Sequence, residues 1–222
     1  MSQVDAIPLP AVLWRRLPAL GIAPAALLRN AGLPLSLLAE TRPKVTTAGF
    51  FALWQALEDL DADPMFGLRL ASEASADQLD VASIAAMHAP TFGEALQKLA
   101  RYKRLVCPEE VQIDTTLREV GVSFRWCLSD ESPPARLIDA CLASCLLLGR
   151  HGTGRDLQPL RVELARTEAH RVMLESHFGC PVVFNAPLNR IAFEPAALDL
   201  PFRTANPDLL AMLLPGLEKA LI

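Results

Sequence analysis

The sequence predicts an α+β fold, in which a helical N-terminal half is followed by an antiparallel β-sheet packed with helices. Before Pro108 the apolar residues recur at the three- and four-residue spacing of amphipathic helices. After Pro108 they alternate with polar residues, as they do in half-buried strands. Hydrophobic residues make up 51% of the 222 positions, above the usual globular share, which indicates an extensive buried core.

The first sixty residues are expected to form short helices and one longer helix. Pro10 and Pro24 suit the first turn of a helix and Gly32 suits a helix end, so two short helices are expected, with a third around residues 35–39. The stretch TTAGFFALWQALEDL places its apolar residues on one stripe, and Thr46 or Thr47 is expected to cap it. Its aromatic residues are expected in the core rather than in a ligand wall.

The next helices carry the first candidate binding residues. Short helices are expected at 64–70 and 80–89, and then Thr91 and Glu94 form a T-x-x-E capping box before an apolar-periodic helix. Tyr102 lies on the apolar side of that helix, and Arg101 and Arg104 flank the stripe. The helix face that carries Arg101 and Arg104 has two interpretations. It is either a solvated surface whose positive charge complements the helix dipole, or an edge that contacts anions.

The second half begins with a hairpin and a buried helix. Residues 109–128 alternate as two strands with a tip at 118–121, and place Trp126 on the apolar face and Arg125 on the opposite face. The helix at 133–150 is apolar nearly all round, so it is expected to be buried against the sheet and against a second subunit.

The last third predicts a strand, a helix and a strand pair. Residues 160–165 alternate as a strand, and the following helix ends at Gly179. The runs PVVF and NRIAFEP are expected to pair across a turn at 185–189. A final helix starts at Asn206, and Pro215 is expected to break or kink it.

The segment HFGCPVVFNAPLNRIAFEPAALDLPFRTANPDLL resembles the end of the arabinose-binding-type effector domain of AraC/XylS-like transcription regulators. DADPMFGLRLA (61–71) and APTFGEALQKLARY (89–102) also resemble that family, so the likeness covers roughly residues 10–215. Asn185 stands where the family usually has Gly, and Asn also tolerates a positive φ.

The resemblance implies one effector-binding and dimerisation domain over residues 10–215. Its helical part is expected at 10–107, its sheet-containing part at 108–206, and a C-terminal linker helix at 207–222. The domain would bind a small organic effector and control a C-terminal helix-turn-helix module. The sequence ends at Leu221-Ile222, where that module would begin, so the chain is expected to be a piece that lacks it.

Composition restricts the partners and the compartment. The net charge of −4, with no basic patch or recognition helix, predicts that this chain contacts DNA only through the missing module. No apolar run approaches eighteen residues and the N-terminus lacks a signal-peptide pattern, so a cytoplasmic chain without a membrane span is expected.

The five cysteines are scattered and expected to be buried thiols. Cys141 and Cys145 share a helix without a second ligand pair, so no metal or cofactor is expected.

Two other function classes compete with a ligand sensor. No motif of a hydrolase, metalloprotease or dinucleotide enzyme is present, and the pair Cys180 and His177 has only sequence proximity in its favour, so no catalytic residue is expected. A protein-interaction or dimerisation scaffold without a ligand is the main alternative, and a small-molecule enzyme is the weaker one. A closed apolar pocket with convergent charged groups would separate a sensor from a scaffold.

We expect the effector pocket between the helical half and the sheet. One of Arg101, Arg104 or Arg125 would anchor the effector, and Tyr102 and Trp126 would form aromatic walls. Arg125 and Trp126 lie on opposite faces, so at most one of them lines a given cavity. The alternative is that both aromatics are ordinary core and all three arginines ordinary surface. A homodimer is expected through the 133–150 helix or the 207–221 segment.

Overall fold

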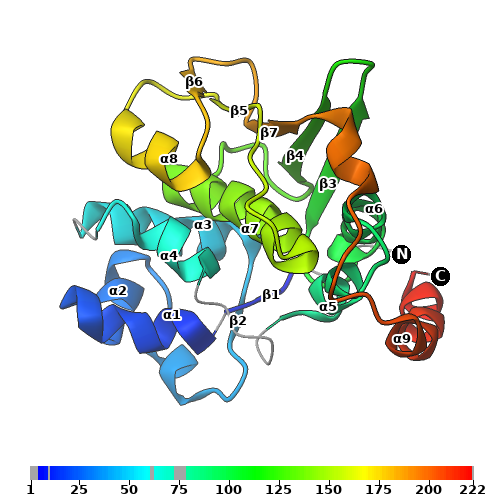
Figure 1. Ribbon diagram of the computed structural model, residues 1–222. Coiled ribbons are helices and arrows are strands. Elements are labelled where there is room, and N and C mark those ends of the chain that lie inside the picture. The colour runs from blue at the N-terminus through cyan, green and yellow to red at the C-terminus, as the bar shows by residue number, and fades with distance from the viewer. Residues whose placement is uncertain (1–4, 10, 61–62, 73–78, 222) are drawn as a thin grey trace.

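The computed structural model describes residues 5–9, 11–60, 63–72 and 79–221, and it confirms the α+β class (Figure 1). The N-terminal half is largely helical. Its elements are β1 (Ile7–Pro8), α1 (Ala11–Arg16), the 3₁₀ helices η1 (Leu17–Leu20) and η2 (Leu35–Ala39), α2 (Pro24–Asn30), β2 (Lys44–Val45), α3 (Thr47–Asp59), α4 (Phe66–Ser72), α5 (Val81–Met87), α6 (Phe92–Tyr102) and the 3₁₀ helix η4 (Lys103–Leu105).

Side-chain caps begin the helices where the sequence predicts them. The Thr46 hydroxyl accepts a hydrogen bond from the Gly49 amide at 3.2 Å, and the Thr91 hydroxyl accepts one from the Glu94 amide at 3.2 Å. Both caps are confirmed. The antiparallel pair β1–β2 was not expected from the sequence. It pairs Pro8 with Lys44 and forms a two-stranded strap across the helical half.

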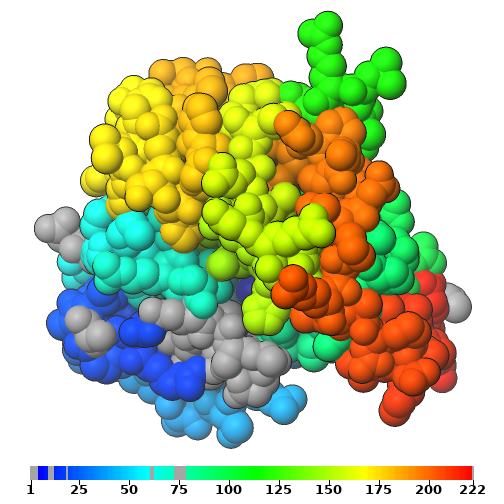
Figure 2. Space-filling view, in the orientation of Figure 1, coloured from blue at the N-terminus to red at the C-terminus, as the bar shows by residue number. Residues whose placement is uncertain are grey.

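The second half contains the main sheet and its covering helices: β3 (Glu109–Thr115), β4 (Val120–Trp126), α7 (Ala135–Thr153), β5 (Arg161–Leu164), α8 (Arg171–Phe178), β6 (Val182–Phe184), β7 (Arg190–Phe193), the 3₁₀ helix η5 (Pro195–Asp199) and α9 (Pro207–Ala220). The sheet order is β3-β4-β7-β5-β6, and β3 and β4 form the expected hairpin. Its turn lies at residues 116–119, two residues before the expected tip at 118–121. Figure 2 shows this turn standing clear of the body of the molecule.

The expected pairing of PVVF with NRIAFEP is wrong. The first run is β6, which pairs in parallel with β5, whereas the second is β7, which lies between β4 and β5. The reason is topological: α8 carries the chain from the end of β5 back to the start of β6, and such a crossover connects parallel strands. The sheet is therefore mixed, with one parallel pair in an otherwise antiparallel order.

The core forms on both sides of α7. One row of apolar residues crosses the inner sheet face in register on all five strands: Ile113, Val122, Ile191, Val162 and Val182. This face packs in one cluster with α6 and α7, and α3 and α4 lie on the other side of α7 (Figure 1). The apolar excess of the 133–150 segment is thus largely buried within the chain, which leaves little of it for a second subunit.

Two positions expected to adopt a left-handed backbone do so, and one expected helix break is absent. Gly179 ends α8 at φ 73°, and Asn185 has φ 56°, as expected for an Asn in place of Gly. Helix α9 continues through Pro215 to Ala220, so the proline does not end the helix. Within the described residues, no helix has the length and apolar character needed to cross a membrane.

Candidate ligand-binding groove

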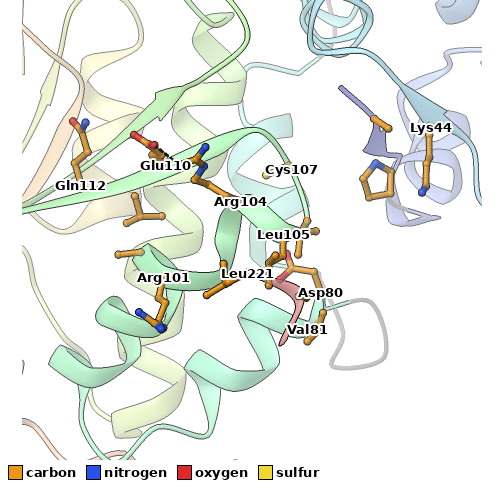
Figure 3. Close-up of a pocket in the computed structure, with 16 residues that line it drawn as sticks. Lys44, Asp80, Val81, Arg101, Arg104, Leu105, Cys107, Glu110, Gln112 and Leu221 are labelled. Carbon is orange, nitrogen blue, oxygen red and sulfur yellow. Dashed lines mark ion pairs between the residues drawn. The ribbon is translucent and has the colours of Figure 1, made fainter. Parts of the chain in front are cut away.

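A groove of about 1180 Å³ lies where the strap, the edge of the main sheet and the end of α9 meet (Figure 3). Among the described strands, β3 is the first in the sheet order and pairs with β4 alone, and three of its residues, Glu110, Val111 and Gln112, line the groove. The apolar part of the lining comes from the strap, α5, α6, η4, β3 and α9: Ala6, Pro8, Val81, Ala100, Leu105, Val106, Cys107, Val111, Ala220 and Leu221.

The charged part of the lining has more cations than carboxylates. Its side chains are Lys44, Asp80, Arg101, Arg104 and Glu110. An Arg104 nitrogen lies 3.1 Å from a Glu110 oxygen, and Lys44 forms no ion pair with any residue that the structure describes. Three further residues pair with this lining, namely Lys103, Arg125 and Glu218, and Glu109 pairs in turn with Lys103. In this set of nine side chains, five cations face four carboxylates. The groove is thus locally positive in a chain whose net charge is −4.

A buried polar cluster lies beneath the groove. Lys103 Nζ is 3.5 Å from an Asp80 oxygen and 3.9 Å from a Glu109 oxygen. Glu109 is only 3% exposed, and its two oxygens accept hydrogen bonds from the thiols of Cys141 at 3.4 Å and Cys107 at 3.7 Å. Burial raises the pKa of Glu109 and raises the pKa of Cys107 to about 12.

These thiols are therefore protonated near neutral pH, and a protonated thiol is a weak nucleophile and a poor metal ligand. Among the described residues, no three His, Cys, Asp or Glu side chains are arranged to hold a metal ion. The cluster stabilises the corner where η4 turns into β3, and it forms part of the groove floor through Asp80 and Cys107.

A second charged cluster lies on the outer sheet face. Arg161 and Arg190 each reach both Glu119 and Glu163, at distances of 2.6–2.9 Å. Hydrogen bonds from Arg161 lower the pKa of Glu119, and hydrogen bonds from Arg190 lower the pKa of Glu163. Both guanidinium groups already have carboxylate partners here, so this network joins β5 and β7 to the turn before β4 rather than offering a free binding group.

Helix α9 is attached to the body at both ends. At its start, the Asn206 amide donates to the His88 carbonyl at 3.1 Å, and the Thr204 hydroxyl donates to the Met87 carbonyl at 2.5 Å. In its last turns, Glu218 accepts hydrogen bonds from Arg101 and from the Tyr102 hydroxyl. Between them lies a small apolar cluster: Ala82, Ala85, Tyr102, Leu210 and Leu217.

The electrostatics of this contact follow from its geometry. The hydrogen bonds from Arg101, and then from Tyr102, lower the pKa of Glu218 to about 2. Burial, and then the neighbouring Glu218 carboxylate, raise the pKa of Tyr102 above its usual value. Just past these residues, Ala220 and Leu221 reach the groove, so the α9 contact and the groove share one end of the helix.

Comparison with known proteins assigns the fold and its family. The family model described as the arabinose-binding domain of AraC transcription regulator, N-terminal, matches residues 21–202. The chain belongs to this family. Because the family is one of regulatory effector-binding domains in transcription regulators, the match favours a regulatory role over an enzymatic one.

A solved structure has the same fold as this arabinose-binding-type domain. It is the crystal structure of the transcriptional regulator CdpR from Pseudomonas aeruginosa, with a TM-score of 0.63 and 21% sequence identity. The alignment covers 91% of this chain and 61% of the CdpR chain. The comparison with curated proteins found no significant match.

The structure places the candidate binding residues of this domain in four locations. Arg101 and Arg104 line the groove. Arg125 lies on the outer sheet face, where it pairs with Glu110. Tyr102 is 3% exposed and faces α9, and Trp126 is buried in the N-terminal helical cluster, so neither aromatic ring lines the groove.

Sequence reasoning missed the strap and the end of α9 as groove walls. Lys44 lies on a two-residue strand, which is too short to produce any periodic pattern. Leu221 follows the last residue of α9, and only the packing of that helix on α5 and α6 brings it to the groove. No local pattern in the sequence identifies these two positions.

Proposed function

We propose that this chain is the ligand-sensing domain of a transcription regulator, and that a small organic effector binds in the groove beside α9. One observation carries this proposal. The strap, the β3 edge and the end of α9 come from distant parts of the sequence, yet all of them line the same groove. A molecule bound there would touch the core of the domain and its C-terminal helix at once.

The domain would control a C-terminal helix-turn-helix module through α9. Helix α9 is held by two hydrogen bonds before its first turn, by a small apolar cluster and by the Glu218 carboxylate near its C-terminal end, and none of these contacts belongs to the main core. An effector that binds one position of α9 better than another would shift the population of that position, by no more than its differential affinity. This account needs no rearrangement of the main core.

A binding screen with a blocked groove tests this proposal. Val81 lines the groove and is 40% exposed, so Val81→Trp should obstruct the part of the groove beside Leu105 and Leu221 without disturbing the core. Val172 is 81% exposed on α8, outside the groove lining, and Val172→Trp is the matched control. A metabolite library is screened by thermal shift against the wild type and both variants. The effector should stabilise the wild type and Val172→Trp but not Val81→Trp.

The opposite result of this screen is also specific. A compound that raises the melting temperature of all three proteins equally binds elsewhere, and such a result would remove the groove from the account. If no compound of a broad library stabilises the wild type, the result favours the alternative function, a protein-interaction scaffold without a ligand.

A homodimer through the outer face of α9 is also proposed. Helix α7 is mostly covered within the chain, whereas Met212 on α9 is 79% exposed. An exposed apolar side chain of this size on an otherwise attached helix is a candidate contact for a second copy. Light scattering at tens of micromolar should give a dimer mass for the wild type and a monomer mass for Met212→Glu. A monomer mass for the wild type would exclude this dimer.

A further inference from the structure

We infer that the ligand of the groove is an organic acid, a carboxylate attached to an apolar chain or ring, and that Lys44 pairs with this carboxylate. The inference rests on the proposed function and adds to it the chemical class of the ligand and the residue that recognises its charge. It depends on three observations: the pairing of the groove cations, the backbone pairing of the strap, and the apolar residues opposite Lys44.

The first observation is the pairing of the cations. Arg101 is held by Glu218, Arg104 by Glu110, and Lys103 by Asp80 and Glu109. Lys44 is the groove cation with no ion-pair partner among the described residues. An incoming carboxylate can pair with Lys44 without displacing a carboxylate of the protein, whereas at each of the other cations it must compete with one.

The second observation is that the backbone around Lys44 is fixed. Lys44 pairs with Pro8 in the β1–β2 strap, and the Leu9 amide donates to the Pro43 carbonyl at 2.9 Å. The next residue, Val45, is buried in the N-terminal cluster. A charged group on a fixed backbone loses less conformational freedom when it orders around a ligand than one on a mobile loop does.

The third observation is the wall across the groove from Lys44. Figure 3 shows Leu105, Val81 and Leu221 on the far side of the hollow from Lys44, together with Asp80, whose carboxylate pairs with Lys103. Val81 and Leu221 both remain 40% exposed, so they present apolar surface that a ligand body would cover. A lone inorganic anion would leave this wall exposed, and a ligand amine would meet the excess of cations. The combination fits a carboxylate with an apolar body.

Calorimetric titrations with matched acids and amides test the charge requirement. Octanoate, benzoate and phenylacetate are each titrated beside the corresponding primary amide, which has almost the same shape but no charge. At least one acid should bind the wild type, and its amide should bind up to about fivefold more weakly. A fivefold change is roughly 1 kcal/mol, the upper range for an exposed charge pair.

Variants of Lys44 then test the anchor. Lys44→Gln should weaken the binding acid about fivefold and remove its advantage over the amide. Lys44→Arg keeps the charge and should stay within about twofold of the wild type. Lys98→Gln, a lysine of α6 outside the groove lining, is the matched control and should bind as the wild type does. Equal melting temperatures of the variants verify that each one folds.

Failure of this inference is distinguishable from failure of the proposed function. If acid and amide bind equally, if Lys44→Gln binds as the wild type does, or if none of the acids binds, the ligand class or the anchor is overturned. The proposed function still stands in those cases if Val81→Trp blocks a library compound. If instead an acid binds Val81→Trp as tightly as the wild type, the groove is not the site and both proposals fall.

Discussion

The attachment of α9 can be tested by removing one side chain from its apolar contact. Leu217 is 5% exposed and lies in the small cluster with Ala82, Ala85, Tyr102 and Leu210. Leu217→Ala removes three carbon groups from this contact. At about 0.8 kcal/mol for each buried group, the docking of α9 should weaken by about 2.4 kcal/mol. Because water can refill a contact at the edge of the molecule, no further cavity cost is added.

Hydrogen–deuterium exchange measures this docking directly. The amides of α9 exchange when the helix undocks, so their exchange should accelerate by about sixtyfold in Leu217→Ala, which is 2.4 kcal/mol at about 1.36 kcal/mol for each tenfold. Amides of the inner sheet strands should keep their protection. Lys219→Ala, at an exposed position of the same helix outside the groove lining and outside the apolar cluster, is the matched control and should leave the exchange of α9 unchanged.

Two results would refute this reasoning. If the exchange of α9 accelerates less than about fivefold, the apolar cluster does not hold the helix. If α9 and the inner strands lose protection together and equally, α9 is part of the global unfolding unit, and it cannot serve as a separately movable element that reports the ligand.

Two further predictions concern single contacts. Tyr102 is the chain's only tyrosine, so ultraviolet titration of its phenol should give a pKa above 10.0, and Glu218→Gln should bring it closer to 10.0 because a neighbouring negative charge is lost. Since the folded chain holds this proton more tightly, the free energy of unfolding should fall as the pH rises from 10.0 through the folded pKa. If Glu218→Gln leaves the midpoint of the phenol titration unchanged, the contact between Tyr102 and Glu218 is contradicted. Gly67→Ala should lower the free energy of unfolding by about 2 kcal/mol in urea denaturation. A Cβ at this position would lie 2.3 Å from the Arg136 carbonyl oxygen. The overpacking cost of about 3 kcal/mol exceeds the gain in helix propensity of about 1 kcal/mol. Gly216→Ala, with no atom near its added Cβ, should instead be neutral or stabilising, and equal effects of both changes would argue against the close α4–α7 packing.

The sequence predicts the elements well where local chemistry determines them. The caps at Thr46 and Thr91, the left-handed Gly179 and the β3–β4 hairpin depend on residues close together in the chain, and all four are present. The partner of β6 was not predictable in the same way. Strand alternation shows which residues share a face, but it does not show which strand lies alongside.

The candidate site was harder to predict than the fold for the same reason. Alternation places Trp126 on the apolar face of β4, but the helical cluster that buries it comes from residues far earlier in the chain. Helical periodicity likewise places Tyr102 on the apolar side of α6 without showing that α9 covers it. The groove joins positions 44, 81, 104 and 221, which only tertiary packing brings together.

The central claim is that one ligand in the groove contacts the strap, η4 and the end of α9 together. Hydrogen–deuterium exchange of the wild-type chain, with and without a saturating effector from the thermal-shift screen, tests this most directly. The account predicts increased protection in β2, in η4 and in the last turn of α9, and unchanged exchange in α8. Protection confined to α8 or to the strands β5 and β6, with no change in α9, would contradict it.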